Sequence, residues 1–494
     1  MNGNLFAAFA EAAARASESV FVEVPGGRVI AYKALETETA ALGGALIAAG
    51  VSPGDRVAVQ VAKSPEAVLL YLSCLRIGAV FVPLNSAYTP PEVRSFTKDA
   101  EPHLIVCDPK DAAAYASLAP AILTLDAAGK GTLIDAAAKA DPAPVAERAA
   151  EDLAAILYTS GTTGRSKGAM LSHRALEANA RALVDLWRFT ADDVLVHALP
   201  INHVHGLFVA LHVPMLAGAT IRLLPHFDAD AVVAAMAGAT CLMGVPTYYT
   251  RLLTTPGFTC EVAAPIRLFI SGSAPLLPQS FEAFERHTGH RILERYGMTE
   301  AGMIASNPYD GPRLPGTVGY PLPETEARIQ GGGNGPGVLE IRGPGLFSGY
   351  WRMPEKTAEE HSADGWFITG DIATIADDGR IAIVGRAKDL IIAGGFNIYP
   401  KEIELLIDAL PGVTESAVIG VPHPDLGEAA VAIVAVEPSC DLDEAAIVAT
   451  IAPALARFKQ PRRVLLTDAL PKNAMGKVEK AKLREQHAGL FTSV

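Results

Sequence analysis

Short apolar runs alternate with longer helical stretches along this chain, and no other feature constrains its fold as strongly. Within residues 56–108 the run RVAVQVA is followed by SPEAVLLYLSCLRIGA, then by VFVPLN and HLIVCD. Such a rhythm is typical of α/β architecture with largely parallel sheets. A second series, which includes VLVHALP, CLMGVP and RLFISGS, extends over residues 194–297. The pattern predicts a large N-terminal α/β domain with stacked sheets.

The pattern changes after Pro315. Glycine and proline separate short runs such as VLEIRG and IAIVGR, which indicates a small distorted barrel. After Arg386 the chain starts a further α+β segment of about a hundred residues, which is an ordinary domain size. We place the boundary at Ala387, so the expected domains are residues 1–387 and a small C-terminal domain of residues 388–494.

Composition and charge exclude several classes of protein. The net charge of −13 argues against nucleic-acid binding, and it requires any anionic ligand to meet a local group of cations. No apolar run reaches the roughly 18 residues of a membrane span. The first 21 residues are typical of an amphipathic helix and not of a signal peptide. Five widely spaced cysteines without a C-x-x-C pair indicate buried free thiols in a reducing compartment, so we expect a cytoplasmic protein without a membrane partner.

The segment YTSGTTGRSKG, residues 158–168, carries more glycines, hydroxyls and cations than a turn needs. Backbone N–H groups in a glycine-rich turn can form an anion-binding concavity, and a lysine adds a point charge for phosphates. The segment is not a P-loop, because Ser166-Lys167-Gly168 stands where Gly-Lys-Ser/Thr would be required. Taken alone it could also be a solvated linker. The candidate phosphate-binding residues are Thr159, Ser160, Gly161, Thr162, Thr163, Gly164 and Lys167.

The chain resembles the adenylate-forming enzymes, which comprise acyl-CoA synthetases, luciferases and peptide-synthetase adenylation domains. The resemblance covers nearly the full length and rests on seven motifs in the family's order: YTSGTTGRSKG, ALPINHVHG, ISGSAPL, ERYGMTE, FITGD, VGRAKDLIIAGGFNIYPKEIE and LPKNAMGKVEK. It implies ATP, Mg²⁺ and coenzyme A as reaction partners. A carboxylate is first joined to the α-phosphate of ATP, and a thiol then attacks the acyl adenylate.

The resemblance also implies roles for the nucleotide-binding residues. In ERYGMTE, Tyr296 would stack on adenine with Gly297 beside it, Thr299 would bind the α-phosphate and Glu300 would hold Mg²⁺. One carboxylate with phosphate oxygens is a plausible magnesium site. Three further residues are expected at the nucleotide: Ser273 of ISGSAPL, Asp371, which would accept hydrogen bonds from the ribose, and Arg386.

The C-terminal motifs would serve the two half-reactions in turn. Lys477 matches the family's catalytic lysine, and Lys388 matches the hinge of a mobile C-terminal domain. Lys477 and the attacking thiol of coenzyme A cannot both lie beside the reacting carbon, so a rotation of the C-terminal domain between the half-reactions is expected. Gly394 and Gly395 would line a narrow tunnel for the thiol arm, since glycine permits close approach.

The acid-binding residues resemble those of the malonyl-CoA synthetases within this family. Arg251 and Ser271 match an arginine and a hydroxyl residue that hold a distal carboxylate, and His203 matches the gate histidine, although Asn202 replaces the usual aromatic residue. A buried carboxylate must be paired, and arginine can bind it with two hydrogen bonds. Alternatively, Arg251 extends to solvent. His205 is either a second polar contact to the acid or a core histidine.

These expectations define a ligase that forms malonyl-CoA from malonate, ATP and coenzyme A. The chain ends soon after Lys477 without a carrier-protein segment, which favours free coenzyme A as acceptor. Two alternatives stay open: a ligase for another acid such as methylmalonate, acetate or a medium-chain acid, and a non-catalytic nucleotide-binding relative. The chain has no G-x-S-x-G nucleophile motif.

Overall fold

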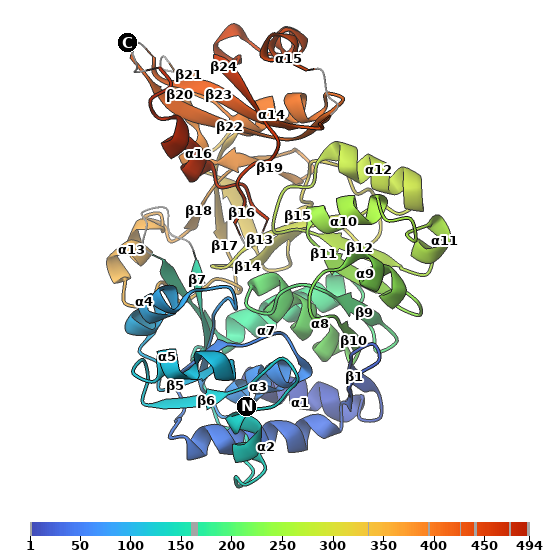
Figure 1. Cartoon of the computed structure of the whole chain (residues 1–494), viewed down its shortest axis with the longest axis vertical. Coiled ribbons are helices and arrows are strands. Elements are labelled where there is room, and N and C mark those ends of the chain that lie inside the picture. The colour runs from blue at the N-terminus through green and yellow to red at the C-terminus, as the bar shows by residue number, and fades with distance from the viewer. Residues whose placement is uncertain are drawn as a thin grey trace. The chain divides into compact units, whose positions relative to one another are not determined.

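The computed structural model describes residues 2–159, 166–333, 335–393, 396–424, 426–438, 442–473 and 476–491 (Figure 1). The chain divides into two compact units. The first unit comprises Met1–Leu276, Ser280–Glu326 and Arg342–Trp366, and the second comprises Leu277–Gln279, Ala327–Ile341 and Phe367–Val494. This division does not test where a mobile domain would pivot, so the boundary at Ala387 stays a prediction.

A six-stranded sheet in the first unit contains the early apolar runs. Its strand order is β6-β5-β3-β4-β7-β8, and all neighbours are parallel except β7 and β8. The strands are β3 (Arg56–Gln60), β4 (Val80–Pro83), β5 (Leu104–Cys107), β6 (Ala121–Thr124), β7 (Leu153–Thr159) and β8 (Lys167–Ser172). Helix α3 (Pro65–Arg76) follows β3 and begins at the N-cap Ser64, whose side chain accepts a hydrogen bond from the Ala67 N–H.

A nine-stranded sheet contains the second series of apolar runs. Its order is β15-β14-β13-β12-β11-β9-β10-β1-β2, and the six strands from β13 to β1 are parallel. The strands are β1 (Val20–Glu23), β2 (Val29–Ala31), β9 (Val194–His197), β10 (Thr220–Leu223), β11 (Cys241–Gly244), β12 (Leu268–Ser271), β13 (Leu293–Met298), β14 (Gly302–Ser306) and β15 (Tyr320–Pro321). The predicted α/β architecture with largely parallel sheets is confirmed.

Helices from both sheets meet in a shared layer. Helix α1 (Leu5–Arg15) packs against α3, α7 (His173–Leu186) and α8 (Ala210–Ala217). On the nine-stranded sheet a separate hydrophobic core forms under α9 (Ala229–Ala235), α10 (Pro246–Leu253) and α12 (Pro278–Thr288). The remaining helices of the first unit are α2 (Ala34–Ala48), α4 (Pro90–Ala100), α5 (Ala112–Tyr115), α6 (Thr132–Ala137), α11 (Cys260–Ala263) and α13 (Pro354–Glu359).

The second unit contains two smaller sheets. The segment after Pro315, expected to form a small distorted barrel, gives a four-stranded sheet of β16 (Glu326–Ile329), β17 (Gly337–Arg342), β18 (Phe367–Ile375) and β19 (Ile381–Arg386). A five-stranded sheet follows, made of β20 (Ile391–Ala393), β21 (Phe396–Ile398), β22 (Val413–His423), β23 (Gly427–Val436) and β24 (Arg463–Thr467).

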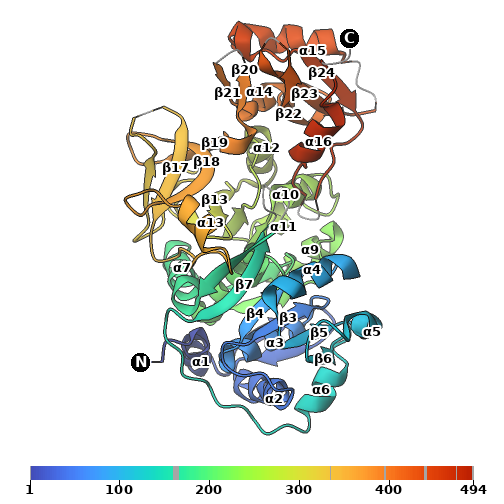
Figure 2. The same cartoon turned by 90° about the vertical axis from the view of Figure 1, so that its left-hand side faces the viewer.

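Alternation along β23 builds two cores on the five-stranded sheet. Ala430, Ala432 and Val434 pack on the face covered by α14 (Pro400–Asp408) and α15 (Glu444–Ile451). Val431 and Ile433 pack on the opposite face with α16 (Lys480–His487). Successive side chains of a strand point to opposite faces, so this apolar run is buried on both sides. Figure 2 shows the helices on this sheet.

Two expectations drawn from composition can be compared with the described residues. Among them, no helix has the length and hydrophobicity needed to cross a bilayer. Cys74, Cys107 and Cys241 are buried free thiols, as expected. Cys260 is exposed at the start of α11, so the expectation of burial was wrong there, and Cys440 lies outside the described residues.

We predict that Phe284→Ala destabilises the first unit by about 3–5 kcal/mol, the usual cost of removing a buried aromatic ring. The Phe284 side chain is fully buried, and its ring centroid lies 4.9, 5.3 and 5.9 Å from those of Phe269, Tyr249 and Phe258. Urea unfolding followed by tryptophan fluorescence measures the change. Glu282→Ala, on the exposed side of the same helix, is the control and should shift the transition little. Equal shifts in both variants would contradict the prediction.

Candidate active site

Strands β7 and β8 bring the two ends of the predicted phosphate loop together. Thr159 and Lys167 pair across the antiparallel ladder, and the Thr159 hydroxyl donates to the Lys167 carbonyl at 3.4 Å. The other loop residues predicted to bind phosphate lie outside the described residues; they are Ser160, Gly161, Thr162, Thr163 and Gly164. Their roles stay predictions.

The Lys167 ammonium is engaged by a tyrosine and a carboxylate that the sequence analysis did not single out. Its Nζ lies 2.7 Å from Glu360 Oε1 and 4.1 Å from the centre of the Tyr350 ring. The Tyr350 hydroxyl lies 3.0 Å from Glu300 Oε1 and 2.7 Å from Glu360 Oε2. A hydroxyl has one hydrogen, so it can donate to only one of these carboxylates at a time. The four side chains form one connected cluster.

Glu300 is the buried member of this cluster. Only 6% of the residue is exposed, and burial raises the pKa of its carboxyl, although the Tyr350 hydroxyl and Lys167 act in the opposite direction. A carboxylate without full charge compensation suits a divalent cation. Because Mg²⁺ usually takes one or two protein carboxylates and completes its shell with phosphate oxygens and water, Glu300 fits that ion as a single protein ligand.

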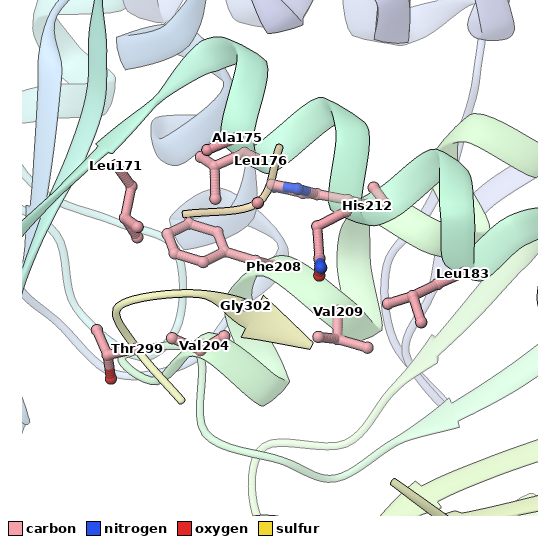
Figure 3. Close-up of a pocket in the computed structure, with 13 residues that line it drawn as sticks. Leu171, Ala175, Leu176, Leu183, Val204, Phe208, Val209, His212, Thr299 and Gly302 are labelled. Carbon is pink, nitrogen blue, oxygen red and sulfur yellow. The ribbon is translucent and has the colours of Figure 1, made fainter. Parts of the chain in front are cut away.

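Strands β13 and β14 and the turn between them position Tyr296, Gly297 and Thr299. Thr299 lies at one end of a narrow, mainly apolar pocket whose other walls come from α7 and from the segment leading into α8 (Figure 3). Tyr296 is half-buried beside a bulge in the ladder. Gly297 leaves no room for a side chain, since a Cβ there would lie 2.2 Å from the Gly302 carbonyl oxygen.

A cation with two unpartnered nitrogens lies inside the first unit, and the sequence analysis missed it. Arg295 on β13 is 3% exposed, and its buried Nε and Nη2 atoms have no hydrogen-bond partner among the described residues. Burial lowers the pKa of this guanidinium to about 9. The group lies against Gly272, where a Cβ would come within 2.5 Å of Arg295 Cζ and Nη1. The signal was available, because Arg295 stands inside the quoted motif ERYGMTE.

His205 lies close enough to Arg295 to be affected by its charge. It is 2% exposed, its Nδ1 lies 3.2 Å from the Ser273 hydroxyl, and its buried Nε2 has no partner among the described residues. Its pKa is held well below the ordinary value by burial and by the positive charge of Arg295. His203 is half-buried nearby in the chain.

Strand alternation separates Ser271 from Arg295. In the parallel pairing of β12 and β13, Ser271 is opposite Glu294, so Gly272 and Arg295 are the next residues along. Adjacent residues of a strand point to opposite faces. Ser271, whose buried hydroxyl has no partner among the described residues, is therefore on a different face from the Arg295 guanidinium.

Arg251 is exposed at the surface of α10. Its guanidinium carbon lies 6.0 Å from the centre of the Phe227 ring, a weak cation–π arrangement. The structure does not place it in a buried pocket, and its role toward a distal carboxylate stays a prediction.

The remaining predicted residues lie in the second unit. Asp371 is 2% exposed and pairs with Arg386, whose Nε is 2.6 Å from Asp371 Oδ1; the two residues are also opposite each other in the ladder of β18 and β19. Burial lowers the pKa of Lys388, which lies in the turn after β19. Gly394 and Gly395 lie outside the described residues.

Lys477 is exposed at the end of a tight turn in the second unit. Its N–H donates to Asn473 Oδ1 at 3.1 Å, and its carbonyl accepts from the Asn473 N–H at 2.9 Å. Because these bonds involve the Lys477 backbone, the turn fixes the main chain at the position from which the side chain extends.

Comparisons with known proteins bear on the family and the fold of this chain. Residues 9–351 match the family model described as AMP-binding enzyme, and residues 402–477 match the AMP-binding enzyme C-terminal domain. A malonate–CoA ligase of Arabidopsis thaliana is 34% identical over 482 residues, which cover 88% of this chain and 78% of the relative. A feruloyl-CoA synthase of an Amycolatopsis species is 35% identical, with 93% and 94% covered. The crystal structure of ATP-bound MatB from Rhodopseudomonas palustris is 50% identical, with a TM-score of 0.95, and 99% of this chain and 100% of that chain are covered.

We predict that Glu360→Gln lowers the Kd for ATP by about two- to fivefold, measured by calorimetry without added metal. Any phosphate that takes Lys167 must first displace Glu360, and a partly buried ion pair of this kind is worth up to about 1 kcal/mol. The adjacent Glu359→Gln is the control, because Glu359 is more exposed and pairs with Lys356. A higher Kd in Glu360→Gln would instead mean that this carboxylate assists nucleotide binding.

Proposed function

This chain belongs to the AMP-binding enzyme family, and on that premise we propose that it is an acid–CoA ligase that makes malonyl-CoA from malonate, ATP and coenzyme A. We choose a diacid as the substrate because of the environment of Arg295. A guanidinium that is 3% exposed and has two unpartnered nitrogens is costly unless an anion pairs with it. The second carboxylate of malonate is such an anion.

The similarity to a malonate–CoA ligase supports the same substrate. The feruloyl-CoA synthase is equally similar in sequence, so overall identity does not choose between the two acids. Our preference for malonate rests on the buried Arg295 guanidinium. A large aromatic acid with a single carboxylate has no second carboxylate to pair with Arg295.

In the first half-reaction, a carboxylate oxygen of malonate attacks the α-phosphorus of ATP and pyrophosphate leaves. Both reactants are anionic, so cations must offset their repulsion. Thr159, Lys167 and Thr299 would hold the phosphates, with the loop between the first two. Tyr296 would stack on adenine, Ser273 and Gly297 would lie beside the nucleotide, and Asp371 with Arg386 would hold the ribose. A magnesium ion, held by Glu300, would neutralise phosphate charge.

In the second half-reaction, the thiol sulfur of coenzyme A attacks the acyl carbon and AMP leaves. Lys477 would act in the first step only, Lys388 would lie at the pivot between the two arrangements, and Gly394 and Gly395 would line the path of the thiol arm. His203 would act as the gate of the acyl pocket, with His205 inside it. Coenzyme A is thus the proposed acceptor.

We expect release of pyrophosphate and formation of a thioester with malonate, and much slower reaction with acetate and octanoate. Both products should be measured with these acids and with methylmalonate, which tests tolerance of a branch beside the carboxylates. Faster turnover of octanoate or ferulate than of malonate would refute the diacid proposal. Inactivity with every acid would favour the non-catalytic alternative.

Arg295→Gln should lower kcat/KM for malonate by about a hundredfold or more, because breaking a buried charge pair costs about 3–5 kcal/mol. The rate with acetate should change far less. Arg251→Gln is the matched comparison: an exposed ion pair is worth about 1 kcal/mol at most, so its loss should cost no more than about fivefold. If the malonate-specific loss follows Arg251 and not Arg295, the distal carboxylate is bound by Arg251, as the sequence predicted.

Lys477→Ala should abolish adenylate formation but still allow thioester formation from supplied malonyl adenylate. The expectation follows from assigning this lysine to one half-reaction. Pyrophosphate release and thioester formation measure the two steps separately. Lys480→Ala in the same tail is the control, since its ammonium pairs with Glu404. Equal loss of both steps in Lys477→Ala would argue against the assignment.

A further inference from the structure

Lys63 joins the two sheets of the first unit through bonds to neutral groups only. It stands after β3 of the six-stranded sheet, and its Nζ lies 3.0 Å from Nδ1 and 2.8 Å from the carbonyl oxygen of His197, the last residue of β9 in the nine-stranded sheet. Among the described residues no carboxylate lies within ion-pair distance of Lys63, and its pKa is held well below the ordinary value by burial. A lysine held by a histidine and a carbonyl in this way needs a reason other than a surface ion pair.

The His197 ring also forms a hydrogen bond to a backbone carbonyl. His197 is fully buried, and its Nε2 lies 2.8 Å from the Gly206 carbonyl oxygen. A carbonyl only accepts, so Nε2 carries the ring hydrogen. Nδ1 then has a lone pair, which accepts a hydrogen from the Lys63 amino group. The direction of both hydrogen bonds is thereby fixed: Lys63 donates to His197, and His197 donates to Gly206.

The bond from His197 to Gly206 closes the neck of a loop. Between these residues the chain turns back so tightly that a Cβ on Gly206 would lie 2.0 Å from the Pro200 carbonyl oxygen. The loop contains His203, and His205 stands at its neck as the first residue of a π-helical turn, His205–Val209. Such turns are rare and often occur at functional sites. His205 is the same residue that contacts Ser273 and is influenced by the charge of Arg295.

We propose that Lys63 is a positioning residue for the acid-binding pocket, acting through His197 on the Gly206 carbonyl to hold the loop that carries His203 and His205. Lys63 does not itself touch the reacting atoms. The identification of this loop with the acid pocket rests on the proposed function. The hydrogen-bond relay from Lys63 to Gly206 does not.

The first test is kinetic. In Lys63→Met the KM for malonate should rise by about tenfold, as expected for loss of a hydrogen bond that positions the loop, while the KM for ATP changes less than about twofold. His197→Leu should behave alike. His197→Gln should recover most of the loss, because its amide can donate to Gly206 and accept from Lys63. Melting temperatures should be measured for all three variants, and rates should be given per folded enzyme.

Two kinetic outcomes would overturn the proposal. One is an unchanged KM for malonate in both Lys63→Met and His197→Leu. The other is an equal rise in the KM values for malonate and ATP, with no recovery in His197→Gln, which would show a general structural defect. If another acid of the panel proves to be the substrate, the proposed function fails, and the same comparison is made with that acid.

The second test needs no substrate. Nitrogen NMR of the histidine side chains in the intact enzyme should show His197 as a neutral ring protonated at Nε2. In Lys63→Met the His197 Nδ1 signal should shift through loss of its donor, and the His205 signals should shift through movement of the loop. A His197 ring protonated at Nδ1, or His205 signals that do not move in Lys63→Met, would refute the relay even if malonate is the substrate.

Discussion

A positive charge removed from water needs an anion or a dense set of acceptors, and this constraint governs the interior of the first unit. Among the described residues, the Arg295 guanidinium lies against Gly272 with two unpartnered nitrogens, and the half-buried Lys63 side chain is bonded to His197. The chain as a whole carries a net charge of −13. The buried carboxylate of Glu294 acts electrostatically on the Arg295 guanidinium, but it does not supply hydrogen-bond acceptors to Nε and Nη2. In the proposed function, the second carboxylate of malonate would supply the missing acceptors to Arg295.

The interior of the first unit also requires glycines at positions where other atoms lie too close to the backbone for a side chain. Gly206, Gly272 and Gly297 each stand where a Cβ would collide with a carbonyl or a guanidinium at 2.0–2.5 Å. Each lies inside a motif that the sequence analysis read for its polar residues: INHVHG, ISGSAPL and ERYGMTE. The glycines of these motifs are thus packing residues, because they let the loop neck close and let Arg295 lie flat on a strand.

The sequence predicted the fold well because apolar runs in parallel sheets are nearly continuous and easily recognised. Motifs also marked Glu300 and Lys167, which the structure brings into one cluster and whose roles stay predictions. The sequence analysis missed Tyr350 and Glu360, since their contacts with those residues join segments 50 and 193 residues apart in the chain. It missed Lys63 for the same reason: a lone lysine at the end of a strand resembles a solvated residue, and its partner is 134 residues away.

Within a motif the sequence could not tell which neighbours share a face. Ser271 was predicted to contact the acid and Arg295 was not, and the pairing of β12 and β13 assigns the two residues to opposite faces of the sheet. The relay through His197 shows the converse, because it joins residues from different sheets at one loop neck. Lys63 follows a strand of the six-stranded sheet and His197 ends a strand of the nine-stranded sheet, so the bond between them depends on how the two sheets pack. The shape of the proposed acid pocket is therefore a property of the packing between two sheets, and no local motif could encode it alone.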